Sequence, residues 1–167
     1  VTVILTEHRG DLEKLAEGLS PEAFVGCTGA EQAERLVAHV RDTLGFRGHH
    51  ADYQDPRNSL LSDVLDRRLG IPITLALVYT EVARRVGVRA RGVGFPGHFL
   101  AKVVGVGDAA QELIIDPFFG RILSLEDCME RLRAAAGEHV PFDPLWVRPA
   151  TAREIWVRML NNLKLLY

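Results

Sequence analysis

The sequence predicts an α+β domain with N-terminal helices, a central buried helix packed on a small antiparallel sheet, and C-terminal helices. Residues 12–44 place apolar side chains at helical spacing, and residues 73–86 are apolar almost all round. Residues 88–115 change to β-rich runs separated by Gly and Pro. Because a helix without a polar face must be covered on all sides, the segment 73–86 is expected at the centre of the domain.

The composition is that of one ordinary globular domain. The 167 residues are 47% hydrophobic and 25% charged, and 20 basic residues nearly balance 22 acidic ones. With this balance the chain has no overall positive electrostatic field that would attract nucleic acid or an anionic membrane, so we expect neither as a partner. There is no run of about 18 apolar residues and no secretory signal pattern. We therefore expect a cytoplasmic protein.

In the first half, Ser20–Pro21 predicts a capped turn, and a helix over residues 33–44 is expected to end at Gly45. Asn58 or Ser59 is expected to cap a further helix that ends near Gly70.

In the second half, a meander is predicted from the runs Val88–Phe95, His98–Val106 and Leu113–Ile115. A helix capped by Ser124 follows, and the last helix begins at about Thr151. The helix after Ser124 is expected to turn four side chains inward: Leu125, Cys128, Met129 and Leu132.

The segment FRGHHADYQDPRN is polar and turn-rich, which predicts a surface loop. Its residues His49, His50, Asp52 and Asp55 carry good metal ligands, but their spacing fits no known site. We therefore expect no metal and no cofactor.

The two cysteines, Cys27 and Cys128, lie outside any CxxC or Cys/His ligand spacing. We expect two reduced thiols, with no disulfide framework and no zinc site.

The order of elements is typical of thiol acyl-transfer enzymes of the papain type. In these enzymes a cysteine begins a buried helix, an imidazole favours its thiolate, and a carboxylate or amide orients the imidazole. Here His98 opens a predicted strand in GFPGHFLAKV, and Asp116 closes the next one in LIIDPFFG. The second and third parts of such a site are therefore present.

The run RRLGIPITLALVYTEVARRVGVRARGVGFPGHFLAKV, followed by IIDPF and preceded by DYQDPRNSLLSDVLDRR, resembles the bacterial SirB family. The resemblance covers about residues 45–125 and implies a variant transglutaminase-like, papain-like core within a domain of residues 1–150. Residues 151–167 would be a helix leading to a further C-terminal region. The chain starts at Val1 and stops within NNLKLLY, so we expect a fragment, with the family's helical repeats after Tyr167.

The resemblance also locates the nucleophile. Active members carry a cysteine, a small residue four positions later and a glycine fifteen positions later. Aligning Ala76 and Gly87 with the last two puts the nucleophile position at Pro72, and proline has no nucleophilic group. Thr74 is two residues further on, about 200° around the helix, and is expected to point away from His98.

Three functions stay open. The leading one is a non-catalytic module that binds a protein or peptide. The second is a hydrolase or acyltransferase that uses His98 and Asp116 with Ser59, Cys27 or a water as nucleophile. The third is a structural module, in which Asp116 starts the turn that follows it and hydrogen-bonds His98. The residues expected to line the binding cleft are Asn58, Ser59, Pro72, Thr74, His98 and Asp116.

Overall fold

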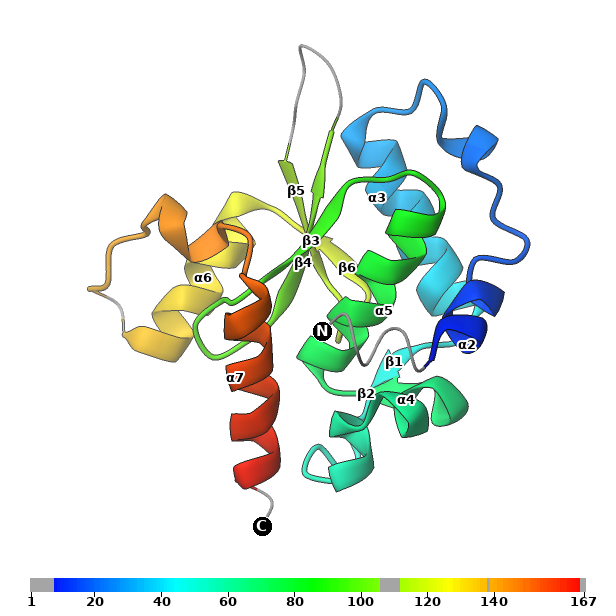
Figure 1. Ribbon diagram of the computed structural model, residues 1–167. Coiled ribbons are helices and arrows are strands. Elements are labelled where there is room, and N and C mark those ends of the chain that lie inside the picture. Colours follow the sequence, from blue (N-terminus) through cyan, green and yellow to red (C-terminus); the bar gives the residue numbers. More distant parts are fainter. Residues whose placement is uncertain (1–7, 106–111, 138, 166–167) are drawn as a thin grey trace.

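The domain is the predicted α+β fold, in which helices enclose a small antiparallel sheet (Figure 1). The predicted end of the second strand, Val106, lies outside the described residues. The first and last residues, Val1 and Tyr167, also lie outside them. Among the described helices, none is long and apolar enough to cross a membrane. The computed structural model describes residues 8–105, 112–137 and 139–165.

Helical elements make up the first half and the end of the chain. Three of the α-helices begin with a capping box, in which a Ser or Thr side chain and an acidic side chain three residues later bond each other's backbone N–H. In chain order the elements are α2 (Arg9–Lys14), η1 (Pro21–Phe24), α3 (Gly29–Val37), the π-helical η2 (Ala38–Thr43), η3 (Pro56–Ser59), α4 (Leu61–Arg67), α5 (Pro72–Arg85), α6 (Leu125–Ala136), η4 (Pro144–Val147) and α7 (Ala152–Lys164).

The main sheet is an antiparallel meander in the order β3-β4-β5-β6, and β1 pairs with β2 in a separate parallel sheet. Its register pairs Ala101 with Ile115 and Asp116 with Arg121. The strands are β1 (Arg47–Gly48), β2 (Leu69–Gly70), β3 (Ala90–Val93), β4 (Leu100–Val104), β5 (Glu112–Asp116) and β6 (Arg121–Leu123).

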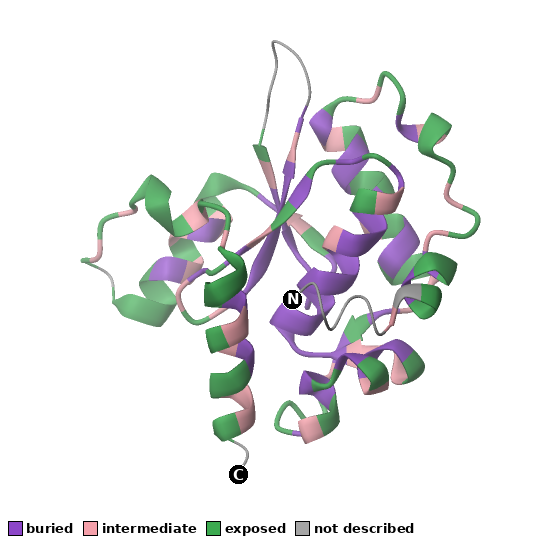
Figure 2. Cartoon of the chain, in the orientation of Figure 1, coloured by how far each residue is buried: buried purple, intermediate pink, exposed green. Residues whose placement is uncertain are grey.

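The two faces of the meander carry two separate cores. Helices α3 and α5 contact one face, where Ala101 and Val103 join the larger core. Helix α6 covers the other face, where Leu100 and Ile114 meet Leu132. This alternation follows from the two-residue period of a strand. Helix α5 is buried almost throughout, as its apolar sequence predicts (Figure 2).

Helix boundaries in the first half differ from the predicted ones. Asn58 and Ser59 do not cap α4, because both belong to η3, and Leu60 stands at the N-cap without a side-chain hydrogen bond. The helix ends at Arg67, three residues before Gly70, and its C-cap residue Arg68 adopts a left-handed φ of 60°. Helix α2 is also shorter than the apolar spacing of residues 12–19 suggested.

In the second half the meander is confirmed, with three corrections. His98 does not open β4 but lies in the turn before it, two residues from Leu100. A fourth strand, β6, follows the DPFFG turn and was not predicted. Ser124 caps α6 as expected, but Leu125 is 60% exposed and does not face inward. Helix α7 begins after Thr151 as expected, and its Ile155 is buried in the larger core.

Candidate functional site

The predicted His–Asp pair is formed. His98 Nε2 lies 3.1 Å from Asp116 Oδ1, and the His98 side chain is 16% exposed while that of Asp116 is fully buried. The turn that carries His98 is held from α7, because Arg158 donates hydrogen bonds to the carbonyl oxygens of His98 and Phe95. The imidazole therefore has a fixed place at the surface, next to a buried carboxylate.

Asp116 has more partners than a residue that only orients an imidazole. Its Oδ1 also accepts hydrogen bonds from the backbone N–H groups of Phe118 (2.9 Å) and Phe119 (3.2 Å), which fixes the DPFFG turn. Its Oδ2 lies 2.5 Å from an Arg131 guanidinium nitrogen. Both predicted uses of Asp116, starting the turn and bonding His98, occur together.

The electrostatics favour an ionised Asp116. Burial alone would raise the pKa of its carboxyl, but the hydrogen bond from His98 and the charges of His98 and Arg131 outweigh burial and lower the pKa. Asp116 and Ile114 lie on the same face of β5, and α6 packs against that face. Arg131 belongs to α6, so its guanidinium reaches the carboxylate from that helix. Helix α6 thus supplies a counter-charge to the buried carboxylate.

Pro72, which the family resemblance aligns with the nucleophile, is the first residue of α5 and is buried. Thr74 is also buried, and its hydroxyl oxygen accepts a hydrogen bond from the Ile71 N–H at 3.2 Å and lies 2.9 Å from the Asn58 carbonyl oxygen. That hydroxyl therefore closes the first turn of α5. In the part of the chain that the structure describes, no hydroxyl or thiol is hydrogen-bonded to the His98 ring.

Cys27 lies at the wrong end of α5 to serve His98. It lines a cavity of about 550 Å³ together with Val86 and Gly87, which follow the last turn of that helix. Pro72 begins the same helix of 14 residues, a length of about 20 Å. Ser59 is buried in η3, where its backbone belongs to the turn around Asn58.

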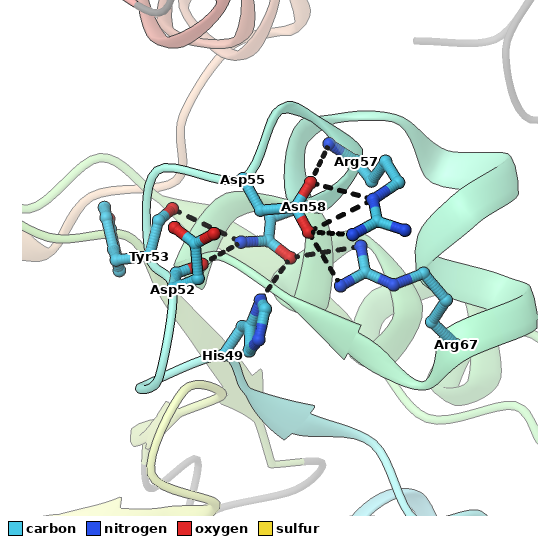
Figure 3. Close-up of polar contacts among 7 residues, drawn as sticks. All are labelled: His49, Asp52, Tyr53, Asp55, Arg57, Asn58 and Arg67. Carbon is cyan, nitrogen blue, oxygen red and sulfur yellow. Dashed lines mark hydrogen bonds and ion pairs between the residues drawn. The ribbon is translucent and has the colours of Figure 1, made fainter.

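The buried side chain of Asn58 organises the loop before it (Figure 3). Its amide nitrogen donates to the carbonyl oxygens of Asp52 (2.8 Å) and Tyr53 (3.3 Å). Its amide oxygen accepts from His49 Nδ1 at 3.0 Å and from Arg67 at 3.4 Å. Asn58 thus supplies the loop backbone with hydrogen-bond partners that a helix or strand would otherwise provide.

Asp55 completes this network. Its carboxylate bonds the Arg57 guanidinium at 2.8 Å and the Arg67 guanidinium at 3.0 Å (Figure 3). The hydrogen bonds from Arg57 lower the pKa of Asp55 to about 2. Of the four loop residues considered as metal ligands, His49 and Asp55 are thus used in protein contacts. Among the described residues, no group of three His, Cys, Asp or Glu side chains is placed to hold a metal ion.

An aromatic cluster that was not predicted from the sequence lies beside the His–Asp pair. The Phe118 ring lies 4.5 Å from His50, 5.7 Å from Tyr53 and 6.4 Å from His98, measured between ring centroids. Phe119 stacks on His98 at 6.5 Å and is 46% exposed. The signal in the sequence was the pair of phenylalanines directly after Asp-Pro, together with aromatic residues in the polar loop.

The predicted site residues thus fall into two groups. One is the pair His98 and Asp116, and the other is Asn58 with Thr74. No hydrogen bond joins the two groups across residues 8–105, 112–137 and 139–165. Phe118 links them sterically, because it touches the loop before Asn58 and the ring of His98.

Comparison with known proteins supports the ancestry that this arrangement suggests. The family model described as "Transglutaminase-like superfamily" matches residues 6–161. The chain belongs to the transglutaminase-like superfamily. In the structure His98 and Asp116 form a pair, and Pro72 is the first residue of the central helix α5.

Relatives of the domain occur in bacteria and in animals. A UPF0162 protein of Xylella fastidiosa is 48% identical over 128 residues, which is 74% of this chain and 44% of the relative. A UPF0162 protein of Pseudomonas aeruginosa is 32% identical over 157 residues, 94% of this chain and 56% of the relative. Human F-box only protein 21 is 32% identical over 128 residues, 73% of this chain and 19% of that protein. The chain therefore spans about half the length of these UPF0162 relatives. No solved structure matches.

Proposed function

We propose that this transglutaminase-like domain is non-catalytic and binds a protein or peptide, as part of a SirB-type bacterial protein. One observation carries the proposal. The nucleophile position is a buried proline at the start of α5, and the only hydrogen-bond partner of the His98 ring in the described chain is Asp116. Thiol acyl transfer needs a thiolate next to an imidazole, so this geometry supports the loss of that chemistry.

What remains around the pair suits binding. Phe119 and Tyr53 are 46% and 53% exposed, and both lie beside His98 or Phe118. Aromatic side chains with few rotatable bonds are common anchors of interfaces, because they bury much area at low entropic cost. The buried network of Asp116 holds the turn that carries Phe119, so the surface is arranged before a partner arrives.

A random-peptide display selection on the full-length protein tests the proposal. We expect enriched peptides that lose at least tenfold in affinity when Phe119→Ala or His98→Ala is introduced. His139→Ala is the matched control, because His139 is exposed and lies in the segment after α6, outside the DPFFG turn. Selection of no peptide, or of peptides that bind all variants equally, would contradict a binding role for this surface.

A water-activating hydrolase is the second candidate function. The observation that favours it is that His98 is partly exposed and is held by an ionised carboxylate, as a general base requires. Assays of amide and ester hydrolysis on the purified protein separate it from the first proposal. Turnover that falls at least 100-fold with His98→Ala and is unchanged with His139→Ala would favour this reading.

A further inference from the structure

A cavity of about 280 Å³ opens beside the DPFFG turn, between that turn and β1. Its volume is just below the range typical of pockets for drug-sized ligands, and it therefore suits a single side chain or a small ion. Neither His98 nor Asp116 lines this cavity, but Phe118 and Phe119 belong both to its lining and to the aromatic cluster. Its walls are Arg41, Phe46, Arg47, Gly48, His50, Phe118, Phe119 and Gly120.

The charged side chains of this cavity have one sign. Arg41 and Arg47 line it together with His50, and none of the lining residues is acidic. The nearest paired carboxylate is that of Asp42, 3.9 Å from the Arg41 guanidinium, and it is 64% exposed. Such an exposed pair is screened by water and salt and neutralises little of the charge.

Arg41 keeps donors for a ligand. One of its terminal nitrogens donates to the Gly120 carbonyl oxygen at 3.4 Å, a long hydrogen bond. A guanidinium has five N–H donors, and its flat fork matches an oxyanion. No side-chain hydrogen bond or ion pair of Arg47 occurs in the described chain, so its donors face the cavity or solvent.

The cavity is shaped by two glycines at points of close contact. A Cβ on Gly48 would lie 2.5 Å from the Phe118 ring, and a Cβ on Gly120 would lie 2.3 Å from Arg41 Cδ. Gly120 also has a φ of +61°, a region that other residues rarely adopt. The two glycines therefore let Phe118 and Arg41 approach the backbone and form the two walls of the cavity.

We propose that this cavity binds the carboxylate side chain of an acidic residue in a peptide partner. The inference rests on the proposed binding function and names the chemistry of the partner. The guanidinium groups of Arg41 and Arg47 would hold the carboxylate. The exposed Phe119 at its edge would contact the apolar part of the neighbouring peptide residues.

Two observations favour a peptide over nucleic acid. The cavity accepts one side chain, whereas nucleic-acid binding needs a basic stripe that follows a phosphate backbone. The chain as a whole has a net charge of −2, so it has no overall positive field that would attract a nucleic acid.

Two probes test the inference on the full-length protein. The first is N-acetyl-glutamate amide against N-acetyl-glutamine amide, titrated by NMR. The second is a pair of fluorescein-labelled peptides from the display selection that differ only in one Glu-to-Gln change. We expect saturable shifts near Gly48 and Gly120 with the glutamate probe alone, and about tenfold weaker binding of the glutamine peptide.

Variants of the two arginines show which positive charge binds the carboxylate of the peptide. Arg41→Gln and Arg47→Gln should each weaken the glutamate peptide about tenfold and leave the glutamine peptide unchanged, because each removes a charged donor to the carboxylate. Arg153→Gln is the matched control, since Arg153 is an exposed arginine on α7. Thermal melts of all three confirm folding. Equal affinity of the two peptides, or no effect of both cavity variants, overturns the inference.

The two proposals fail in different ways. Display peptides that lack acidic residues and still require Phe119 would leave the binding function standing and refute the acidic partner. A selection without any binder would remove the peptide-binding function and with it the peptide partner. In that case the N-acetyl-glutamate amide titration still reports whether the cavity holds a carboxylate.

Discussion

The ion pair between Asp116 and Arg131 gives a prediction about stability. Asp116→Asn keeps an acceptor for His98 and for the turn amides but leaves the Arg131 guanidinium, whose side chain is only 21% exposed, without a counter-charge. Removal of one partner of a buried ion pair lowers the free energy of unfolding by about 3–5 kcal/mol. Because the Arg131 side chain is partly exposed, we expect a loss of ~3 kcal/mol. For a chain of this length that is a fall in Tm of about 6–12 °C.

Thermal and urea unfolding of Asp116→Asn, Arg131→Met and the double variant measure this cost. The double variant should be more stable than Asp116→Asn alone by at least ~1 kcal/mol, because it no longer holds an unpaired charge. His98→Ala should be milder than Asp116→Asn, since Arg131 and the turn amides still hold the carboxylate. A Tm of Asp116→Asn within 2 °C of the wild type would refute the view that the Arg131 guanidinium depends on the charge of Asp116.

Three further variants test contacts elsewhere in the domain. Gly48→Ala should lower stability by about 1–3 kcal/mol, because the new methyl group meets the Phe118 ring, and calorimetry would show this loss. Asn58→Ala should cost about 2–4 kcal/mol and should speed proteolysis within residues 49–57, because the loop loses its two shorter hydrogen bonds. Asp55 should make the domain sensitive to acid, because its pKa in the folded protein is about 2, below the ordinary 3.8. The ionised Asp55 therefore stabilises the fold fully above pH 3.8, and this stabilisation is lost as the pH falls from 3.8 towards 2. In Asp55→Asn the acid limb of the stability curve should therefore be shallower, and an unchanged limb would argue against the pairing of Asp55 with Arg57.

Much of the architecture could be predicted from local patterns. Helix α5 was predicted because residues 73–86 are apolar almost all round. It begins one residue earlier, at Pro72, and proline suits the first turn of a helix. The meander followed from β-rich runs between Gly and Pro signals. Strand β6 could not be predicted, because its three residues carry no periodic signal and it forms by pairing with β5.

The candidate site was predictable only in part. His98 and Asp116 were identified because they belong to recognisable motifs at the ends of predicted strands. The partnership of Asp116 with Arg131 could not be inferred, because it depends on how α6 packs on the sheet. The role of Asn58 was mistaken for a helix cap, since Asn is a common cap and nothing in the sequence shows that its amide turns back to the loop.

The contact of Phe118 with Gly48 has a consequence for the evolution of the domain. The two positions lie 70 residues apart in the chain, yet the ring occupies the space that any side chain at position 48 would need. Substitutions at them should therefore be correlated across homologues: a larger residue at 48 should occur only with a smaller one at 118. A lineage that lost this correlation would have reshaped the wall between β1 and the turn.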